Sequence, residues 1–311
     1  MSLWLIGTGP HAVEYSKVLT HLNLDYEVIG RGSESAEAFF KLTGKKPNIG
    51  GIKNALNLLT PPTDAIVAVS FEELSHVAID LIKAGTKRIL LEKPGGLNKQ
   101  QIQLIHDGAE KYKSSVWIAY NRRFYSSTLQ ALQGIADDGG AISCNFEFTE
   151  WAHKIKPWKA PSGVKQFLMI ANSSHVADLA FFICGKPKEW KGWYNGATSW
   201  HPASARFCGA GITENKILFS YNADWEGPGR WGLEVITRKN RFIFKPLEQL
   251  YVTKIGSVAV DQIVLNDQLD KNFKPGLYLQ TKAFIDNNCE NLCSLSEQVN
   301  MISIYSKMAG Y

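Results

Sequence analysis

The sequence lacks most features of a secreted or membrane-bound protein. It has five cysteines in 311 residues, an odd number without a C-x-x-C pair, so neither a disulfide framework nor a metal site is expected. No apolar run approaches the roughly 20 residues of a membrane span. The first apolar run breaks at Gly7, and no basic segment precedes it as in a secretory signal. We therefore expect a cytoplasmic protein with no membrane partner.

Concentrated basic charge is also missing. The formal net charge is +5, and the lysines and arginines are spread along the chain, so no nucleic-acid partner is expected. Internal repeats and low-complexity linkers are absent from the sequence as well. What remains is ordinary globular material, 45% hydrophobic and 20% charged, and it is long enough for two domains with a core each.

The first motif is the run Gly7-Thr8-Gly9-Pro10-His11-Ala12. It lies between an apolar run at 3–6 and a segment at 13–19 with helical spacing, which predicts a strand, a tight turn and a helix. In that context G-x-G-x-x-A predicts a dinucleotide site, with the pyrophosphate on the amides of the helix N-terminus. The alternative is that a short Gly-x-Gly string arose by chance.

The second predicted strand, 26–29, is followed by Gly30 where an NAD-preferring fold usually has Asp or Glu. Arg31 and Ser33 come next, and a planar guanidinium suits a 2′-phosphate. The sequence therefore favours NADP over NAD as cofactor. The alternative is that Arg31 is a solvated loop residue.

Strands and helices then alternate, with strands expected at 64–70, 88–91 and 116–119 and helices at 74–84 and 99–112. This alternation predicts right-handed crossovers and a parallel sheet, so residues 1–119 are interpreted as a Rossmann dinucleotide-binding domain of an α/β protein. Lys93 follows the strand at 88–91 and should lie at the carboxyl edge of the sheet, where ligands bind in such folds.

Beyond residue 120 the pattern changes to alternating polar and apolar residues at 142–148, 212–221, 231–237 and 241–244. Such alternation predicts an open-faced, mostly antiparallel sheet. Helices are expected at 127–136, 175–183, 277–287 and 296–309, and the turn-rich stretch 224–231 is interpreted as a hairpin. Residues 120–311 are therefore expected to form an α+β domain for substrate binding and oligomerisation.

Several segments, in order, resemble the glucose-fructose oxidoreductase, inositol dehydrogenase and MocA-type (Gfo/Idh/MocA) oxidoreductases. They are the run from Gly7 to Ala12, the segments 64–70, 84–94 and 120–124, and Ser174-His175-Val-Ala-Asp178 with Gly185. The resemblance implies an NAD(P)-dependent dehydrogenase or reductase that transfers a hydride between nicotinamide and a secondary alcohol or ketone of a carbohydrate. The substrate would be a sugar, polyol, sugar phosphate or nucleotide sugar. It also implies a homodimer or homotetramer formed through the C-terminal sheet.

The resemblance implies two catalytic residues, Lys93 beside the nicotinamide and the substrate hydroxyl, and His175 facing it from the second domain. Family dehydrogenases usually carry an Asp four residues before this His, but this sequence has Ala171 there. The following Asn172 is expected to take over the orienting hydrogen bond. The alternatives are that His175 is a packing residue and that Asp178 caps or pairs locally.

The remaining candidates come from the motifs and the resemblance together. Glu92 is interpreted as an orienter of Lys93 or a backbone anchor, and His76 either lies near the cofactor or is an exposed helix residue. Trp158 either stacks on a sugar ring or fills the sheet face. The cofactor-binding candidates are Gly7, Thr8, Gly9, Pro10, His11, Arg31, Ser33, Ser70, His76, Glu92, Lys93, Pro94 and Asn121. The substrate-binding candidates are Arg122, Arg123, Trp158, Asn172, His175 and Asp178.

Two other functions fit the same residues. Without the usual Asp at position 171, the chain could be a regulator that binds a nicotinamide cofactor without turnover. It could also be a redox-neutral enzyme with tightly held NAD.

Overall fold

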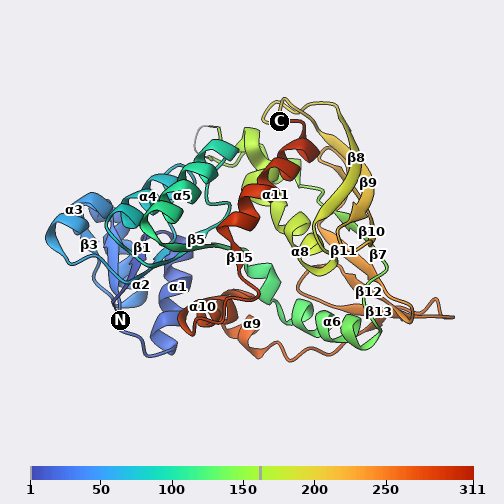
Figure 1. The fold of residues 1–311 in the computed structure, drawn as a ribbon, viewed down its shortest axis with the longest axis horizontal. Helices are drawn as coiled ribbons and strands as arrows, with labels where there is room; N and C mark the ends of the chain where they lie inside the picture. The colour runs from blue at the N-terminus through green and yellow to red at the C-terminus, as the bar shows by residue number, and fades with distance from the viewer. Residues whose placement is uncertain (1, 161–162) are drawn as a thin grey trace. The chain divides into compact units, whose positions relative to one another are not determined.

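The chain divides into two units, Met1–Asn121 with Leu269–Asn300, and Arg122–Gln268 with Met301–Tyr311. The computed structural model describes residues 2–160 and 163–311 (Figure 1). Three segments cross the boundaries between the units: η1 (Asn121–Phe124), α9 (Gln268–Asn272) and α11 (Leu295–Ala309). Each unit is built on its own sheet.

The sheet of the first unit has the strand order β15-β6-β5-β4-β1-β2-β3. Its strands are parallel except β15, which pairs antiparallel with β6. The two central strands are buried along their whole length, as expected for a parallel sheet covered on both faces. The strands are β1 (Leu3–Ile6), β2 (Glu27–Gly30), β3 (Asn48–Ile49), β4 (Asp64–Val67), β5 (Arg88–Glu92), β6 (Ser115–Ala119) and β15 (Cys293–Ser294).

Helices connect these strands and cover both faces of the sheet, with α4 and α5 on one face and α1 and α10 on the other (Figure 1). Read along the sheet, the parallel strands follow the doubly wound order 3-2-1-4-5-6. The predicted Rossmann-type α/β fold is confirmed. The helices are α1 (Pro10–His21), α2 (Ser33–Thr43), α3 (Gly51–Leu58), α4 (Leu74–Lys83), α5 (Lys99–Tyr112) and α10 (Leu277–Ile285).

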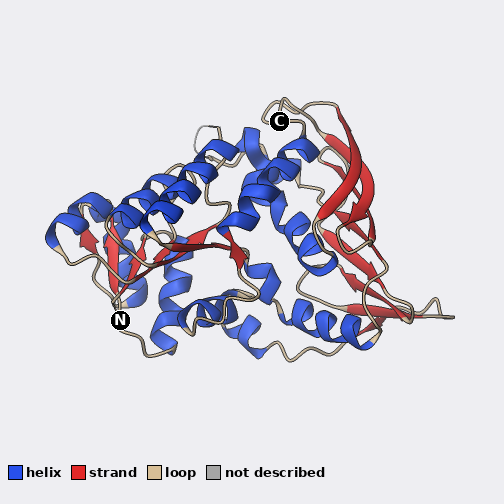
Figure 2. Cartoon of the chain, in the orientation of Figure 1, coloured by secondary structure: helices blue, strands red, loops and turns tan. Residues whose placement is uncertain are grey.

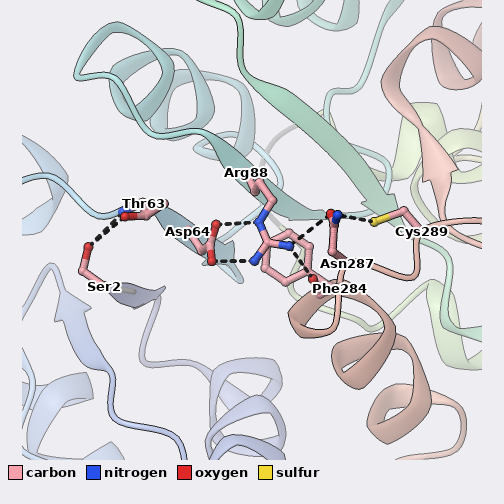
Figure 3. Close-up of polar contacts among 7 residues, drawn as sticks. All are labelled: Ser2, Thr63, Asp64, Arg88, Phe284, Asn287 and Cys289. Carbon is pink, nitrogen blue, oxygen red and sulfur yellow. Dashed lines mark hydrogen bonds and ion pairs between the residues drawn. The ribbon is translucent and has the colours of Figure 1, made fainter.

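The segment Leu269–Asn300 lies with the first unit, although the sequence assigned all of 120–311 to the second domain. Arg88 shows the physical reason (Figure 3). Its guanidinium makes a bidentate pair with the buried Asp64 carboxylate, at 2.8 and 2.7 Å, and donates to the Phe284 carbonyl at 3.1 Å and to the Asn287 side chain at 3.3 Å. One partly buried cation thus joins the amino ends of β4 and β5 to the end of α10.

The sheet of the second unit has the strand order β14-β13-β12-β11-β7-β10-β9-β8. All neighbours are antiparallel except β7 and β10, so the predicted mostly antiparallel sheet is confirmed. The strands are β7 (Ser143–Glu147), β8 (Pro187–Asn195), β9 (Arg206–Thr213), β10 (Leu218–Asp224), β11 (Gly232–Ile236), β12 (Asn240–Phe244), β13 (Tyr251–Lys254) and β14 (Asp261–Gln262).

One face of this sheet packs on α8 (Ser174–Cys184), which contacts β7 and β11. In Figure 2 the helices of this unit, within its described residues, lie on that side of the sheet only. Exposed and buried residues alternate along β10, because successive side chains point to opposite faces: Leu218 is 61% exposed on the other face, while Phe219 is buried. The remaining helical segments of the unit are η1 (Asn121–Phe124), which starts at its boundary, α6 (Ser126–Asp137), α7 (Ala152–Ile155), η2 (Lys165–Phe167) and η3 (Met169–Ser173).

Two sequence predictions in this sheet are wrong. The single strand expected at 212–221 is two strands, because the chain reverses between Thr213 and Leu218, with Lys216 in a left-handed conformation. The expected hairpin at 224–231 is not a hairpin, because β10 and β11 both pair with β7 and lie on opposite sides of it. A strand order of this kind depends on long-range pairing, which local alternation does not report.

Candidate functional site

The turn after β1 leaves no room for a side chain at Gly7. Its φ is +125°, and a Cβ there would lie 2.2 Å from the Ala68 carbonyl oxygen. Its amide donates to the Ile29 carbonyl at 2.9 Å. Gly9 then caps α1, nothing lies within 4 Å of where its Cβ would be, and Pro10 is the first helical residue. These residues suit a phosphate group, because the bare backbone lets an anion approach the amides at the start of α1.

The end of β2 lies beside this turn. A Cβ on Gly30 would come within 2.9 Å of the Thr8 methyl group. The Thr8 hydroxyl donates to the Ser35 hydroxyl at 3.0 Å, and Ser33 is the first residue of α2. The side chain of Arg31 is 78% exposed and lies 3.4 Å from the Glu73 carboxylate. The residues that the sequence assigned to a 2′-phosphate are therefore close to the turn, with Arg31 in a surface ion pair.

Two cofactor candidates follow β4. Ser70 is exposed, and its carbonyl accepts a hydrogen bond from the Glu73 amide at 3.0 Å. His76 is an exposed residue of α4. Neither side chain is buried in the first unit, so both are accessible to a ligand.

The segment after β5 contains a buried carboxylate. Glu92 accepts a hydrogen bond from the Tyr15 hydroxyl at 2.9 Å, and its carboxylate lies 3.6 Å from His11 Nδ1. The Lys274 ammonium lies 3.3 Å from both ring nitrogens of His11, and the Gln280 amide donates to the Tyr15 hydroxyl at 3.1 Å. Glu92 is thus the centre of a network that reaches from α1 to α10.

The pKa of Glu92 lies below its ordinary value. Burial, the largest single influence, acts to raise it. The hydrogen bonds from His11 and Tyr15 and the charges of His11 and Lys274 together outweigh that effect. The same carboxylate, after burial itself, raises the pKa of the Tyr15 hydroxyl. Glu92 is therefore held as an anion, and its contacts fit the predicted anchor role for this part of the chain.

Lys93 is buried and is followed by a cis peptide bond to Pro94. Its ammonium lies 5.4 Å from the centre of the Phe71 ring. The Pro94 carbonyl accepts a hydrogen bond from Gln298 at 2.9 Å, and a Cβ on Gly95 would lie 2.8 Å from Ile118. The backbone around Lys93 is therefore closely packed, which fixes where its side chain leaves the carboxyl end of β5.

The side chain of Asn121, predicted to bind the cofactor, donates to the Pro275 carbonyl at 2.8 Å. It ties the end of β6 to the turn before α10. This contact gives Asn121 a structural role within the first unit.

In the second unit, His175 lies in the first turn of α8 and is buried. The preceding residues, Met169–Ser173, form a wide π-helical turn that contains the buried Ala171. The His175 ring lies 6.1 Å from the ring of Trp231, between centroids. Trp231 directly precedes β11, so the second unit's sheet positions an aromatic ring beside this histidine.

Asn172 does not orient a neighbouring imidazole in the way that the sequence suggested. Its amide donates to the Glu150 carboxylate at 2.9 Å, and the Ser173 hydroxyl donates to the same oxygen at 2.7 Å. The Trp231 indole also donates to this oxygen at 3.2 Å, and Arg230 pairs with the other at 3.1 Å. The structure thus places a carboxylate beside the start of α8, but one supplied from the end of β7.

The pKa of Glu150 is raised. Burial is the largest cause, and it outweighs the hydrogen bonds from Ser173 and Asn172 and the charge and hydrogen bond of Arg230. The Glu150 side chain is 1% exposed, whereas that of Arg230 is 40% exposed. Most of its donors are neutral, so they stabilise the anion less than charged donors would.

Arg123 and Asp178, both predicted to bind substrate, bind each other. The contact is bidentate, at 2.9 and 2.6 Å, and both side chains are buried. The pairing joins η1 to α8 across 55 residues of the chain. Arg122 instead lies over Trp231, with its guanidinium carbon 4.9 Å from the ring centre.

Arg230 lies between two tryptophan rings, 4.5 Å from the centre of Trp231 and 4.9 Å from that of Trp151. Trp151 and Trp158 are each about two-fifths exposed, so neither fills the sheet face. Trp158 follows α7, and its amide donates to the Ile155 carbonyl at 3.1 Å. Because it is partly exposed, Trp158 is accessible to a ligand.

Sequence reasoning missed Glu150, Trp231 and Arg230 as site residues. Phe148 and Thr149 accept hydrogen bonds from the Trp225 indole and the Asp224 amide, at 3.1 Å each, which fixes the chain just before Glu150. Glu147 pairs with Gly232 across β7 and β11, so the residues after β7 meet those before β11. The sequence does show an acidic residue, Glu150, close to the aromatic residues Phe148 and Trp151. The groups that bind Glu150 could not be predicted, because they depend on the strand order.

Comparisons with known proteins identify the fold. No family model matches the chain, and no curated protein matches it in sequence. A helix long and apolar enough to cross a membrane does not occur among the described residues.

Solved structures match over nearly the whole length. UDP-N-acetylglucosamine 3-dehydrogenase from Acidithiobacillus ferrooxidans is 12% identical, with a TM-score of 0.76 over 99% of this chain and 96% of that one. Levoglucosan dehydrogenase in complex with NADH and levoglucosan is 14% identical, with a TM-score of 0.77 over 99% and 95%. An oxidoreductase from Agrobacterium radiobacter in complex with NAD+, L-tartaric acid and magnesium is 11% identical, with a TM-score of 0.77 over 98% and 94%. At these identities the likeness shows that the chain has the fold of NAD-binding oxidoreductases.

Proposed function

We propose that this chain is an NAD(P)-dependent oxidoreductase of the Gfo/Idh/MocA type. It would transfer a hydride between nicotinamide and a secondary alcohol or ketone of a sugar, polyol, sugar phosphate or nucleotide sugar. The observation that carries the proposal is the Gly7 turn, where a Cβ would lie 2.2 Å from a backbone oxygen at the carboxyl edge of a doubly wound sheet. The printed substrates of two structural neighbours, both sugar dehydrogenases, support the substrate class.

The first unit would hold the cofactor. The amides at the start of α1 suit the pyrophosphate, and Arg31 and Ser33 at the end of β2 suit a 2′-phosphate, which is the basis for proposing NADP ahead of NAD. The ion pair of Arg31 with Glu73 is a surface pair of small energy, so a phosphate can replace it. When bound, the nicotinamide accepts or donates the hydride.

The protein's part of the reaction is proton transfer and charge stabilisation. In the oxidation direction, a hydride leaves a carbinol carbon only as the hydroxyl loses its proton. We assign proton acceptance to the His175 imidazole, which suits transfer near neutral pH. We assign stabilisation of the developing alkoxide to the Lys93 ammonium. In the reduction direction the proton returns from His175 to the new hydroxyl.

The proposed assembly is a homodimer or homotetramer formed through the outer face of the eight-stranded sheet. Trp193, Cys208 and Asn222 pair across β8, β9 and β10, so their side chains share one face. Leu218, four positions before Asn222 on β10, lies on that same face, and both Trp193 and Leu218 are more than half exposed. Exposed apolar residues on a sheet face are typical of protein–protein contacts.

The experiment measures cofactor binding and turnover separately. Purified protein is titrated with NAD+ and NADP+ by calorimetry, and nicotinamide absorbance is then followed with UDP-N-acetylglucosamine, levoglucosan, glucose 6-phosphate and myo-inositol. We expect the wild-type protein to bind the nucleotide and to turn over a member of this panel or a relative of it. Lys93→Ala and His175→Asn should lose turnover but retain nucleotide binding. Gly7→Val should abolish binding, whereas Gly44→Ala, at an open helix C-cap with φ of +71°, should not.

The outcomes separate the candidate functions. If wild-type protein binds neither nucleotide, the oxidoreductase proposal fails. Binding without turnover would favour the regulator, which the buried Ala171 in place of a carboxylate supports. If Arg31→Ala weakens NADP+ binding less than about threefold, under about 0.7 kcal/mol, or weakens NAD+ binding equally, the NADP preference is wrong.

A further inference from the structure

We infer that Glu150 is the positioning residue for His175, so that the carboxylate missing at position 171 is replaced in function by one from the end of β7. This inference rests on the proposed function, because it assigns His175 a part in the reaction. Glu150 itself is not proposed to touch the substrate.

Asn172 and Ser173 are consecutive residues of the wide turn before α8, so their side chains leave the turn in different directions. Both donate to one oxygen of Glu150, at 2.9 and 2.7 Å. Two donors at different angles on one fixed atom prevent this turn from rotating about its axis. The direction in which His175 projects, two residues later, is thereby set.

A fixed turn is useful only if Glu150 itself is fixed. The two residues before it accept hydrogen bonds from Trp225 and Asp224, at 3.1 Å each. Glu150 is also 1% exposed and accepts from the Trp231 indole at 3.2 Å and from Arg230 at 3.1 Å. Its position is therefore determined by the sheet.

The same carboxylate also binds an aromatic neighbour of the histidine. The Trp231 ring, whose indole N–H donates to Glu150 Oε1, lies 6.1 Å from the His175 ring between centroids. Glu150 thus holds both the turn before His175 and the tryptophan beside its ring. A displacement of about 1 Å in a catalytic group can lower turnover by about a hundredfold. We therefore expect the loss of these Glu150 contacts to lower kcat.

The test uses Glu150→Ala, the double variant Asn172→Ala/Ser173→Ala, and the triple variant, because glutamine at position 150 would keep an oxygen that can accept from Asn172 and Ser173. The matched control is Glu147→Ala, which removes a carboxylate from the same strand end together with its 2.9 Å pair with Lys245. Turnover and KM are measured with whichever panel substrate the wild-type protein uses, and the Kd of NADP+ by calorimetry. Backbone hydrogen exchange of residues 169–177 is measured by mass spectrometry.

We expect Glu150→Ala and the double variant each to lower kcat by about a hundredfold, with the Kd of NADP+ unchanged. The triple variant should be no slower than either, because both changes break one linkage. Exchange in 169–177 should be at least about tenfold faster in Glu150→Ala than in wild type, and Glu147→Ala should match wild type throughout.

The inference is overturned if Glu150→Ala keeps wild-type kcat, if the losses multiply in the triple variant, or if exchange in 169–177 is unchanged. Should wild-type protein bind NADP+ without turnover, the proposed function fails by that result. The exchange rates then decide the positioning claim alone, since they do not depend on a substrate.

Discussion

Each unit buries one glutamate at the carboxyl end of a strand, and the two carboxylates have opposite pKa shifts. Glu92 follows β5 in the first unit, and its pKa is lowered. Glu150 follows β7 in the second unit, and its pKa is raised. For both, burial is the largest single influence and acts upward, so burial does not explain the difference.

The difference lies in the charge of the donors. Glu92 faces two basic groups, His11 and Lys274, besides the Tyr15 hydroxyl. Glu150 faces one cation, Arg230, which is partly solvated, and three neutral donors. Neutral hydrogen bonds fix a buried carboxylate in place, but charged partners are needed to keep it easily ionised. The first unit therefore holds a stabilised anion, and the second holds a carboxylate fixed for its geometry.

The pH dependence follows from these directions. A lowered folded-state pKa means that Glu92 adds stability above its ordinary value of 4.5, and this stability is lost as the pH falls through the folded-state pKa. A raised folded-state pKa means that ionised Glu150 costs stability at neutral pH. That cost disappears as the pH falls through the folded-state pKa toward 4.5.

The largest expected effect is that of Glu92→Gln. The change removes the anion from two basic groups and weakens the bond from Tyr15, so we expect a loss of about 2 kcal/mol in the free energy of unfolding at pH 7. Urea unfolding at pH 7 and at stepwise lower pH measures it. The gap between variant and wild type should narrow as the pH falls below 4.5.

The control for that experiment is Glu14→Gln, which breaks the exposed pair with Lys17 at 2.7 Å. An exposed pair of this kind contributes about 0.5 kcal/mol or less. An equal loss of unfolding free energy in Glu92→Gln and Glu14→Gln would mean that the buried Glu92 anion stabilises the fold no more than an exposed one. Glu92 would then not be a stabilised anion.

A smaller effect is expected for Tyr15→Phe. It deletes the hydroxyl that donates to Glu92 at 2.9 Å and that accepts from Gln280 at 3.1 Å, at a cost of about 1 kcal/mol. Because one donor to the anion is lost, the pKa of Glu92 should move upward, which carbon NMR of the labelled carboxyl group detects. A pKa that stays in place would show that His11 and Lys274 alone hold Glu92 ionised.

The sequence predicted the first unit well because its signals are local. The Gly7 turn, Ser33 at the start of α2 and Lys93 at the end of β5 each depend on a strand, a turn and a helix that are adjacent in the chain. The assignment of Leu269–Asn300 to the second domain was wrong, because the contact that holds it, from Arg88 to the Phe284 carbonyl, spans 196 residues. No local pattern reports such a contact.

In the second unit the sequence located His175 and its helix but not the group beside it. Asn172 was expected to orient the histidine, yet its amide donates to Glu150. Glu150 and Trp231 are 81 residues apart, and they meet only because β11 pairs with β7. Alternation of polar and apolar residues predicts the faces of strands, but it does not predict which strands are neighbours. The sheet could therefore be predicted, and the cluster around Glu150 could not.

The smallest effect on stability is expected for Glu150→Gln, in which an amide oxygen replaces the carboxylate as acceptor. At pH 7 the ionised carboxylate already costs stability, so a neutral amide of the same shape removes that cost while losing the contact with Arg230. These changes oppose each other, and we expect the free energy of unfolding to change by less than about 1 kcal/mol. As the pH falls through the raised folded-state pKa of Glu150 toward 4.5, wild type should gain on the variant, the reverse of the trend for Glu92→Gln. Parallel urea titrations of the two variants measure both slopes. Glu150→Gln could instead lose as much unfolding free energy as Glu92→Gln at pH 7, with the difference from wild type narrowing as the pH falls. Glu150 would then also be a stabilised anion, and the distinction between the two carboxylates would be wrong.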